Sequence, residues 1–286
     1  MGLTAANLVG YLRAAYAKSA KLRIWQFVIQ LLIAVPAAIS VVVTDNTGSY
    51  ILGIIGAALL VAWVVVNTIY LSERSAAHTA RRAALLAGGL TQPFSAATVL
   101  SLQDRMKVSA ATARGFEKAD YYATQQPPGP ARLAEMIEES AFYSAPLQRA
   151  SARAMLFILL IFAVVAAGIA LSVPFIGKDA SLIVIRIMLA VFVFAMSSDV
   201  IGAYIAHKDA ARSIEEVRTR LMTASSSGYP EADILLALTD YSSAVEGAPE
   251  SVPFAYRFME KDLTDKWNDY QRNRNAARVA AATPVP

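Results

Sequence analysis

Four apolar stretches, each roughly 20 residues long, dominate the pattern of hydrophobic and polar positions along the chain. They cover residues 24–44, 50–71, 154–176 and 182–206. As an α-helix rising 1.5 Å per residue, each stretch is long enough to cross the ~30 Å hydrocarbon core of a bilayer. A helix also satisfies its own backbone hydrogen bonds in lipid, and the short alternating strands of a membrane barrel are absent. The pattern predicts an all-α membrane protein with four transmembrane helices.

The stretches form two pairs, because short polar turns join the first to the second and the third to the fourth. We therefore expect two transmembrane hairpins and a helical cytoplasmic domain built from the central insert and the C-terminal tail. The expected division is an N-terminal helix at 1–23, transmembrane hairpins at 24–71 and 154–206, a helical insert at 72–153, C-terminal helices at 207–275 and a disordered tail at 276–286.

Helix starts and stops can be located within the insert. The second apolar helix meets no breaker before the glycine pair at 88–89, which is expected to end it. A serine cap predicts a further helix over 95–118, and the Tyr-, Gln- and Pro-rich segment 119–129 predicts a loop. A helix resumes near Pro130, and Pro146 is expected to interrupt it before the third apolar stretch.

Similar signals divide the C-terminal tail. The fourth apolar stretch continues as an amphipathic helix, which the Ser- and Gly-rich run at 225–228 is expected to end. Two more helices are predicted over 231–246 and 254–271, separated by prolines. In the first apolar stretch, Pro36 is expected to kink the helix.

Lysine and arginine indicate the orientation, because cytoplasmic loops are enriched in both. The turn at 45–49 carries neither, and the second turn has only Lys178. The insert holds ten such residues: Arg74, Arg81, Arg82, Arg105, Lys107, Arg114, Lys118, Arg132, Arg149 and Arg153. We therefore expect a multi-pass membrane protein with both termini and the insert in the cytoplasm. The net charge of +4 is interpreted as topology, with attraction to anionic lipid as a secondary consequence, and no DNA or RNA partner is expected.

Motifs for enzyme chemistry are scarce. The chain has no cysteine, and its two histidines, His78 and His207, have no partner at the spacing of a metal site. Neither G-x-S-x-G nor H-E-x-x-H is present. The adjacent carboxylates at 138–139 and at 215–216 are interpreted as solvated helix surface, because neighbouring residues on a helix do not share a face. We expect no enzyme activity, no catalytic residue, no cofactor and no metal.

Polar side chains inside the apolar stretches are the first candidates for function. Asp199 lies in the inner half of the fourth stretch, where it either serves a wet functional site or caps a helix at the membrane interface. Arg186 either extends its side chain to the outer interface or lines a pore. Gln26, Gln30 and Asn67 either bond between helices or line an aqueous path.

Aromatic and basic residues of the insert are the second set of candidates. Tyrosines can stack on bases and arginines can hold phosphates, so a nucleotide site is one interpretation. The alternative is that the tyrosines are packing anchors and the arginines are topology signals. The candidate ligand-binding residues are Tyr121, Tyr122, Arg81, Arg82, Arg132 and Arg149.

One order of motifs resembles a known family. Asp-Tyr-Tyr-Ala-Thr at 120–124, then Pro-Gly-Pro, then the polar helix at 132–143 lead directly into the third apolar stretch. The tail carries Val-Pro-Phe-Ala-Tyr-Arg at 252–257. This order resembles the SMODS-associated four-transmembrane pore-forming effectors of bacterial antiphage defence. The chain departs from the family in having Tyr121 where tryptophan is usual and in lacking cysteine.

The resemblance implies an inner-membrane effector that stays silent until a partner synthase makes a cyclic nucleotide. Binding of that ligand to the cytoplasmic helices would open or assemble a homo-oligomeric pore, provided that one conformation binds the ligand more tightly than the other. The alternatives are a membrane-anchored scaffold or signalling partner that does not conduct, and a small transporter. The inverted repeats or broken midplane helices of transporters are not evident in the sequence.

Overall fold

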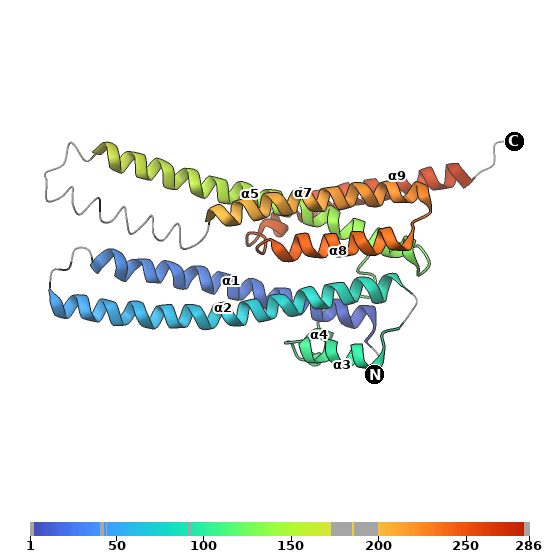
Figure 1. The fold of residues 1–286 in the computed structure, drawn as a ribbon. Helices are drawn as coiled ribbons and strands as arrows, with labels where there is room; N and C mark the ends of the chain where they lie inside the picture. Colours follow the sequence, from blue (N-terminus) through green and yellow to red (C-terminus); the bar gives the residue numbers. More distant parts are fainter. Residues whose placement is uncertain are drawn as a thin grey trace.

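The computed structural model describes residues 3–40, 43, 45–90, 93–172, 185 and 200–282 (Figure 1). Every regular element within these residues is helical. The elements are α1 (Ala5–Ser40), α2 (Asn46–Gly89), α3 (Ala96–Arg105), α4 (Ala110–Arg114), α5 (Pro130–Ser172), α7 (Val200–Ala224), a 3₁₀ turn at Ser225–Ser227, α8 (Glu231–Gly247) and α9 (Ala255–Ala282).

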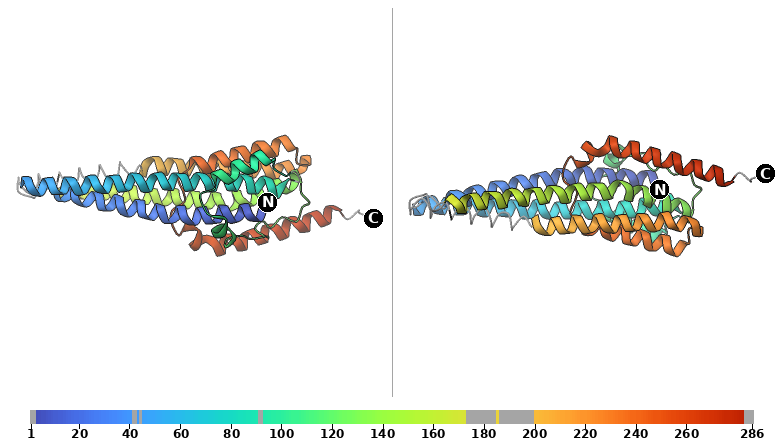
Figure 2. Two further views of the ribbon diagram at one scale, coloured as in Figure 1. Left: turned by 90° about the horizontal axis from the view of Figure 1, so that it is seen from below. Right: turned by 90° about the horizontal axis from the view of Figure 1, so that it is seen from above.

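The long helices form two antiparallel pairs, which we call the first pair (α1 and α2) and the second pair (α5 and α7) (Figure 1). Helix α8 packs on α7, α5 and α2, so it contacts both pairs. Helix α9 lies along α5, on the face of the bundle opposite to α8 (Figure 2). One end of the molecule therefore consists of long bare helices, and the other carries α3, α4, α8 and α9. We call these ends the apolar half and the polar half.

Three helices, α1, α2 and α5, are long and apolar enough to cross a membrane. Their large side chains are exposed in the apolar half, among them Trp25, Phe27, Val61, Phe157 and Val164. A contiguous apolar surface of this kind marks contact with lipid or protein rather than with water. The chain therefore has the character of a membrane protein. Most of the fourth apolar stretch lies outside the described residues, which include only Ile185 and the part from Val200 onward.

The polar half has its own core. Side chains from α2, α5, α7 and α8 meet in one buried cluster whose largest members include Leu85, Leu133, Ile137, Ile214, Ile234 and Tyr241. A smaller cluster joins α1 to α2 through Leu8, Val9, Ala83 and Ala84. The backbones of α2 and α5 are close at Gly89, where an added Cβ would lie 2.7 Å from the Cβ of Leu133. The glycine that ends α2 is therefore also required by packing.

Several predicted boundaries are confirmed. Helix α2 ends at Gly89, as the glycine pair predicted. The segment 119–129 contains no regular helix before α5 begins at Pro130. Helix α7 ends in the 3₁₀ turn, followed by Gly228 with a φ of 74°, a left-handed conformation that glycine adopts without steric cost. Helix α8 begins at the predicted residue and ends one residue later than predicted.

Two predictions about helix continuity were wrong. The helix predicted over 95–118 is two helices, because the side chain of Ser109 accepts a hydrogen bond from the backbone N–H of Thr112 and starts a new one, α4. Helix α5 continues through Pro146, since packing of the neighbouring Ala145 in the core holds the helix together despite one missing backbone donor. Helix α1 contains Pro36 and continues to Ser40, and the kink expected at Pro36 stays a prediction.

The C-terminal helix is longer than predicted. Helix α9 extends to Ala282, so the segment 276–282 is helical where disorder was expected. The physical reason is an anchor within that segment, because the Arg278 guanidinium donates a hydrogen bond of 2.6 Å to the buried Glu135 carboxylate. Residues 283–286 lie outside the described residues.

Candidate functional site: a polar junction between the helix pairs

The end of α8 and the connector to α9, residues 246–252, contact both helix pairs at the border of the apolar half. We call this segment, with the side chains that bind it, the junction. From α2, Arg74 donates hydrogen bonds to the backbone carbonyl oxygens of Glu246, at 3.0 Å, and Ala248. Arg82, two turns further along α2, binds both carboxylate oxygens of Glu246 at 2.8 and 2.9 Å. The first pair thus holds the end of α8 through charge-assisted hydrogen bonds.

Two serines complete the junction. The buried Ser19 hydroxyl of α1 donates a hydrogen bond that the Glu250 carboxylate accepts, with both oxygens at 3.2 Å. From the second pair, the buried Ser151 hydroxyl of α5 accepts a 2.9 Å hydrogen bond from the backbone N–H of Val252. One short segment is therefore bonded to α1, α2 and α5 together. A relative movement of the two pairs at this level must break or rearrange these bonds.

Positive charge partly offsets the cost of burying Glu250. Burial raises the pKa of Glu250 above its ordinary value, and the Ser19 hydrogen bond and the positive charges of Arg23 and Arg74 oppose that rise without cancelling it. Since Arg74 lies near both the helix-end carbonyls and this carboxylate, its charge stabilises the C-terminal end of α8 and the connector at once. Arg74 is therefore the electrostatic centre of the junction.

Two turns along α2 from Arg74 lies Arg81, a buried arginine with no carboxylate within ion-pair distance among the described residues. Arg81 is 8% exposed, and its guanidinium donates a hydrogen bond of 2.8 Å to Nδ1 of His78. The same nitrogen lies 3.0 Å from the Tyr16 hydroxyl. The guanidinium also lies 5.9 and 5.4 Å from the ring centres of Tyr16 and Tyr241, within cation–π range. Side chains of α1, α2 and α8 thus surround one buried charge.

The protonation states in this cluster follow from burial. Desolvation, together with the adjacent Arg81 charge, lowers the pKa of His78 to about 2, so the ring is neutral and Nδ1 accepts. The Nε2–H of the ring has no partner among the described residues. Desolvation raises the pKa of Tyr16 to about 12, so its hydroxyl stays protonated. The cluster therefore keeps a single positive charge across the physiological pH range.

Three carboxylates of α5 are buried, which corrects the interpretation of 138–139 as solvated surface. Glu135 is 2% exposed and accepts hydrogen bonds from Thr124 and Arg278, both at 2.6 Å. Glu138 accepts from the Tyr270 hydroxyl and, at 2.8 Å, from Arg274. The physical reason is that α9 covers this face of α5 and supplies the counter-charges. In the other adjacent pair, Glu215 is half-exposed and Glu216 is exposed, as expected.

The docking of α9 is completed by aromatic packing. Trp267 is 2% exposed, and the centre of its ring lies 5.0 Å from the ring centre of Phe142 on α5. Arg218 of α7 lies over both the Phe142 and the Tyr270 rings, at 4.9 and 5.6 Å. The same face of α9 therefore carries the tryptophan, the tyrosine and the two arginines that bind α5.

The third carboxylate, Glu139, gives a testable pH dependence. Its oxygen accepts a 2.8 Å hydrogen bond from the backbone N–H of Ala123, yet desolvation raises its pKa from 4.5 to about 7. The bond from Ala123 and the charges of Arg274 and Lys118 oppose that rise, and Glu135 adds to it. Because the folded pKa exceeds the unfolded one, the ionised carboxylate destabilises the fold. This penalty is absent below pH 4.5 and complete above about pH 7.

We expect Glu139→Gln to remove this penalty, which corresponds to about 3 kcal/mol at most. The thermal unfolding midpoint of the purified protein in detergent would be measured from pH 5 to 8. The variant should gain stability over the unmodified chain as the pH rises, because the amide still accepts from Ala123 and carries no charge. All other titratable groups are the same in both proteins, so the difference isolates position 139. Parallel pH profiles, like those expected for the exposed control Glu216→Gln, would contradict the assignment.

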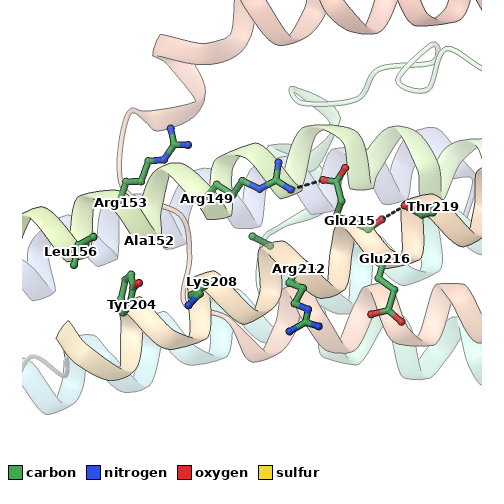
Figure 3. A pocket seen from close by; sticks show the side chains of 11 residues that line it. Arg149, Ala152, Arg153, Leu156, Tyr204, Lys208, Arg212, Glu215, Glu216 and Thr219 are labelled. Carbon is green, nitrogen blue, oxygen red and sulfur yellow. Dashed lines mark hydrogen bonds and ion pairs between the residues drawn. The ribbon is translucent and has the colours of Figure 1, made fainter.

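A basic groove lies between α5 and α7 at the border of the apolar half (Figure 3). It has a volume of about 550 Å³, with Arg149 and Arg153 on its α5 side and Lys208 and Arg212 on its α7 side. Arg149 is neutralised by Glu215 at 2.9 Å. The other three cations are exposed and form no ion pair with any described residue.

The six residues predicted to bind a nucleotide do not gather in one place. Arg81 and Arg82 are engaged in the buried cluster and the junction. Arg132 donates to the backbone carbonyls of Gly88 and Gln126, both at 2.8 Å, and so fixes the end of α2 to the start of α5. Arg149 lies in the basic groove. Each arginine therefore has an internal partner of its own.

The two tyrosines in that set lie against each other, with ring centres 4.9 Å apart in an edge-to-face arrangement. Tyr122 packs against both apolar clusters of the polar half, and Tyr121 lies at the surface, 36% exposed. This placement suits the packing interpretation for Tyr122 and leaves only Tyr121 accessible to a ligand.

The polar residues of the apolar stretches are described in part. The Gln26 amide donates a 2.6 Å hydrogen bond to the Asn67 side chain, so these two bond between α1 and α2. Gln30 is half-buried on α1. Arg186 and Asp199 lie outside the described residues, and their roles stay predictions.

Comparison with protein-family models, curated proteins and solved structures finds no match to this chain. The resemblance to the antiphage effectors therefore rests on the motif residues alone. In the part of the chain that the structure describes, no three His, Cys, Asp or Glu side chains are grouped to hold a metal ion.

Proposed function

We propose that the chain is a gated pore-forming protein of the bacterial inner membrane, whose cytoplasmic helices control four transmembrane helices. The observation that carries this proposal is the junction, which bonds one segment of the polar half to α1, α2 and α5 at the border of the apolar half. A control element for the membrane helices needs such a connection to both pairs.

Helix continuity supports the proposal. Helices α2 and α5 run without interruption from the apolar half into the core of the polar half. A change in the packing of α8 or α9 is therefore transmitted along rigid elements rather than through flexible linkers. Interfaces of this kind switch between discrete arrangements, as gating requires.

The pore itself requires several copies of the chain. Four helices enclose too little volume for a wide aqueous path, so conduction implies a homo-oligomer. Gly53 and Gly56 of α2 have no side-chain neighbour within 4 Å of an added Cβ, and small residues of this kind allow close helix contact between copies. A cyclic nucleotide from a partner synthase remains the proposed signal, on the strength of the motif resemblance.

A second candidate function has support from the same structure. The arginines predicted to hold a nucleotide are engaged in internal contacts, an arrangement that favours a membrane-anchored scaffold over a ligand-gated pore. Liposomes that contain an entrapped fluorescent dye separate the two functions. A pore former should release dye faster than protein-free liposomes, and a scaffold should not.

The proposed topology predicts where single cysteines are accessible. The chain has no native cysteine, so Thr47→Cys, Arg114→Cys and Asn273→Cys each introduce the only thiol. All three positions are exposed. A membrane-impermeant thiol reagent should label position 47 in intact cells, and positions 114 and 273 only after the membrane is opened. Labelling of position 114 or 273 in intact cells would contradict the cytoplasmic placement of the polar half.

A further inference from the structure

We propose that the basic groove between α5 and α7 is a binding site for the headgroup of an anionic phospholipid. The inference rests on the membrane placement proposed above but not on conduction. Arg153, Lys208 and Arg212 border the groove without an acidic partner among the described residues, whereas Arg149 is already paired. Three unpaired cations around one opening favour a ligand with a phosphate group.

The position of the groove favours a phospholipid over a soluble phosphate compound as its ligand. Leu156 and Tyr204 line its apolar side, and the exposed side chains of Phe157, Ile201 and Ile205 continue along the two helices into the apolar half. A phosphate held by the cations would have its acyl chains against this apolar surface. Basic pockets between membrane helices, at the level of the headgroups, bind anionic lipids in this way.

The first helix pair provides a contrast at the same level. Three of its border cations have internal partners: Lys18 pairs with Glu73, Arg23 lies over the Tyr70 ring, and Arg74 binds the junction. Lys21 of α1 is exposed without an ion pair to any described residue, but it stands alone, whereas three such cations of the second pair border one groove. General attraction of basic residues to an anionic surface does not predict this asymmetry, but a specific lipid site does.

The size and shape of the groove agree with a headgroup. Its volume of about 550 Å³ is within the range of small-molecule sites. Long Lys and Arg side chains can reorient around a phosphate while their stems cover apolar surface. Lys208 and Arg212, four residues apart on α7, provide the charges for one side of the site (Figure 3).

The test compares two double variants that remove the same charge. Lys208→Gln with Arg212→Gln alters the groove, and Lys21→Gln with Arg257→Gln removes two exposed, unpaired cations elsewhere in the described part of the chain. The purified full-length chain is placed in phosphatidylcholine bilayers with a minor fraction of spin-labelled phosphatidylglycerol. The measured quantity is the preference of the protein-bound lipid for phosphatidylglycerol over spin-labelled phosphatidylcholine.

We expect the groove variant to lose this preference by about fivefold for each cation removed, and the control variant to retain it. Equal losses in the two variants would overturn the proposal, because they would indicate surface charge alone. Retained preference in the groove variant would overturn it as well. Arg153→Gln, on the α5 side of the groove, gives an independent third variant, and circular dichroism verifies that each variant is folded.

A competition experiment distinguishes a lipid from a soluble phosphate compound. Millimolar inorganic phosphate or glycerol phosphate is added to the same bilayers. Competition that abolishes the phosphatidylglycerol preference would show that the groove takes the free phosphate group, and would overturn the assignment to a lipid. An unchanged preference is the expected result, because the apolar flank contributes only to lipid binding. Membrane placement itself is tested separately by the thiol labelling, so the two failures are distinguishable.

Discussion

Replacement of Glu135 with alanine is expected to detach α9 from α5. The carboxylate accepts hydrogen bonds from Thr124 and Arg278 and forms an ion pair with Arg274 at 3.2 Å. Its removal leaves the Arg274 side chain, 13% exposed, beside Glu138 alone and leaves Arg278 without its acidic partner. Loss of one member of a buried ion pair costs about 3–5 kcal/mol. The cost cannot exceed the free energy with which α9 docks on α5, because the arginines are hydrated again once α9 detaches.

Limited trypsin digestion measures this detachment, because α9 contains several lysines and arginines that docking protects from cleavage. We expect cleavage within α9 to accelerate by at least tenfold in Glu135→Ala. The matched control is Glu216→Ala, which removes an exposed carboxylate and should change the rate by less than about twofold. An unchanged cleavage rate in Glu135→Ala would contradict the assignment of this carboxylate as the anchor of α9.

The second large effect is expected at the junction, where Arg74→Met should loosen the end of α8. The substitution keeps the apolar stem and removes two hydrogen bonds to the carbonyls of Glu246 and Ala248. Each charge-assisted bond contributes about 1.5–3 kcal/mol, and Glu250 also loses a nearby positive charge. The variant should bias the membrane helices away from the closed arrangement. We expect several-fold faster dye release from liposomes than with the unmodified chain or with the exposed control Arg105→Met.

Much of the fold could be predicted from the sequence, because its strongest signals are local. The apolar stretches predicted α1, α2 and the outer part of α5, and the glycines at 88–89 predicted where α2 ends. The amphipathic pattern after the fourth apolar stretch predicted α7, whose buried residues include Ile214, Val217 and Leu221. Each of these conclusions depends on residues within two or three turns of one another. The prediction at Pro146 was wrong for the opposite reason. Tertiary packing keeps α5 continuous there, although proline locally disfavours a helix.

The junction and the buried carboxylates could not be predicted, because their partners lie far apart in the chain. Ser19 and Glu250 are separated by 231 positions, and Glu135 and Arg278 by 143. Neighbouring glutamates on a helix resemble exposed surface until another helix supplies their counter-charges. One signal could have located that helix: Trp267, Arg274 and Arg278 share a face of α9 at helical spacing. In the structure this aromatic and basic face packs on the acidic face of α5.

Control of the pore by the junction can be tested with a reversible crosslink across it. Ser151→Cys and Val252→Cys are introduced into the Arg74→Met variant, where they are the only thiols of the chain. The Ser151 hydroxyl lies 2.9 Å from the Val252 nitrogen, so a short thiol-reactive crosslinker can join the two positions. Dye release from liposomes is measured before crosslinking, after it, and after reduction. We expect fast release, then release near that of protein-free liposomes, then fast release again. Release unaffected by the crosslink, or no faster at any stage than from protein-free liposomes, would contradict control of the pore by the junction.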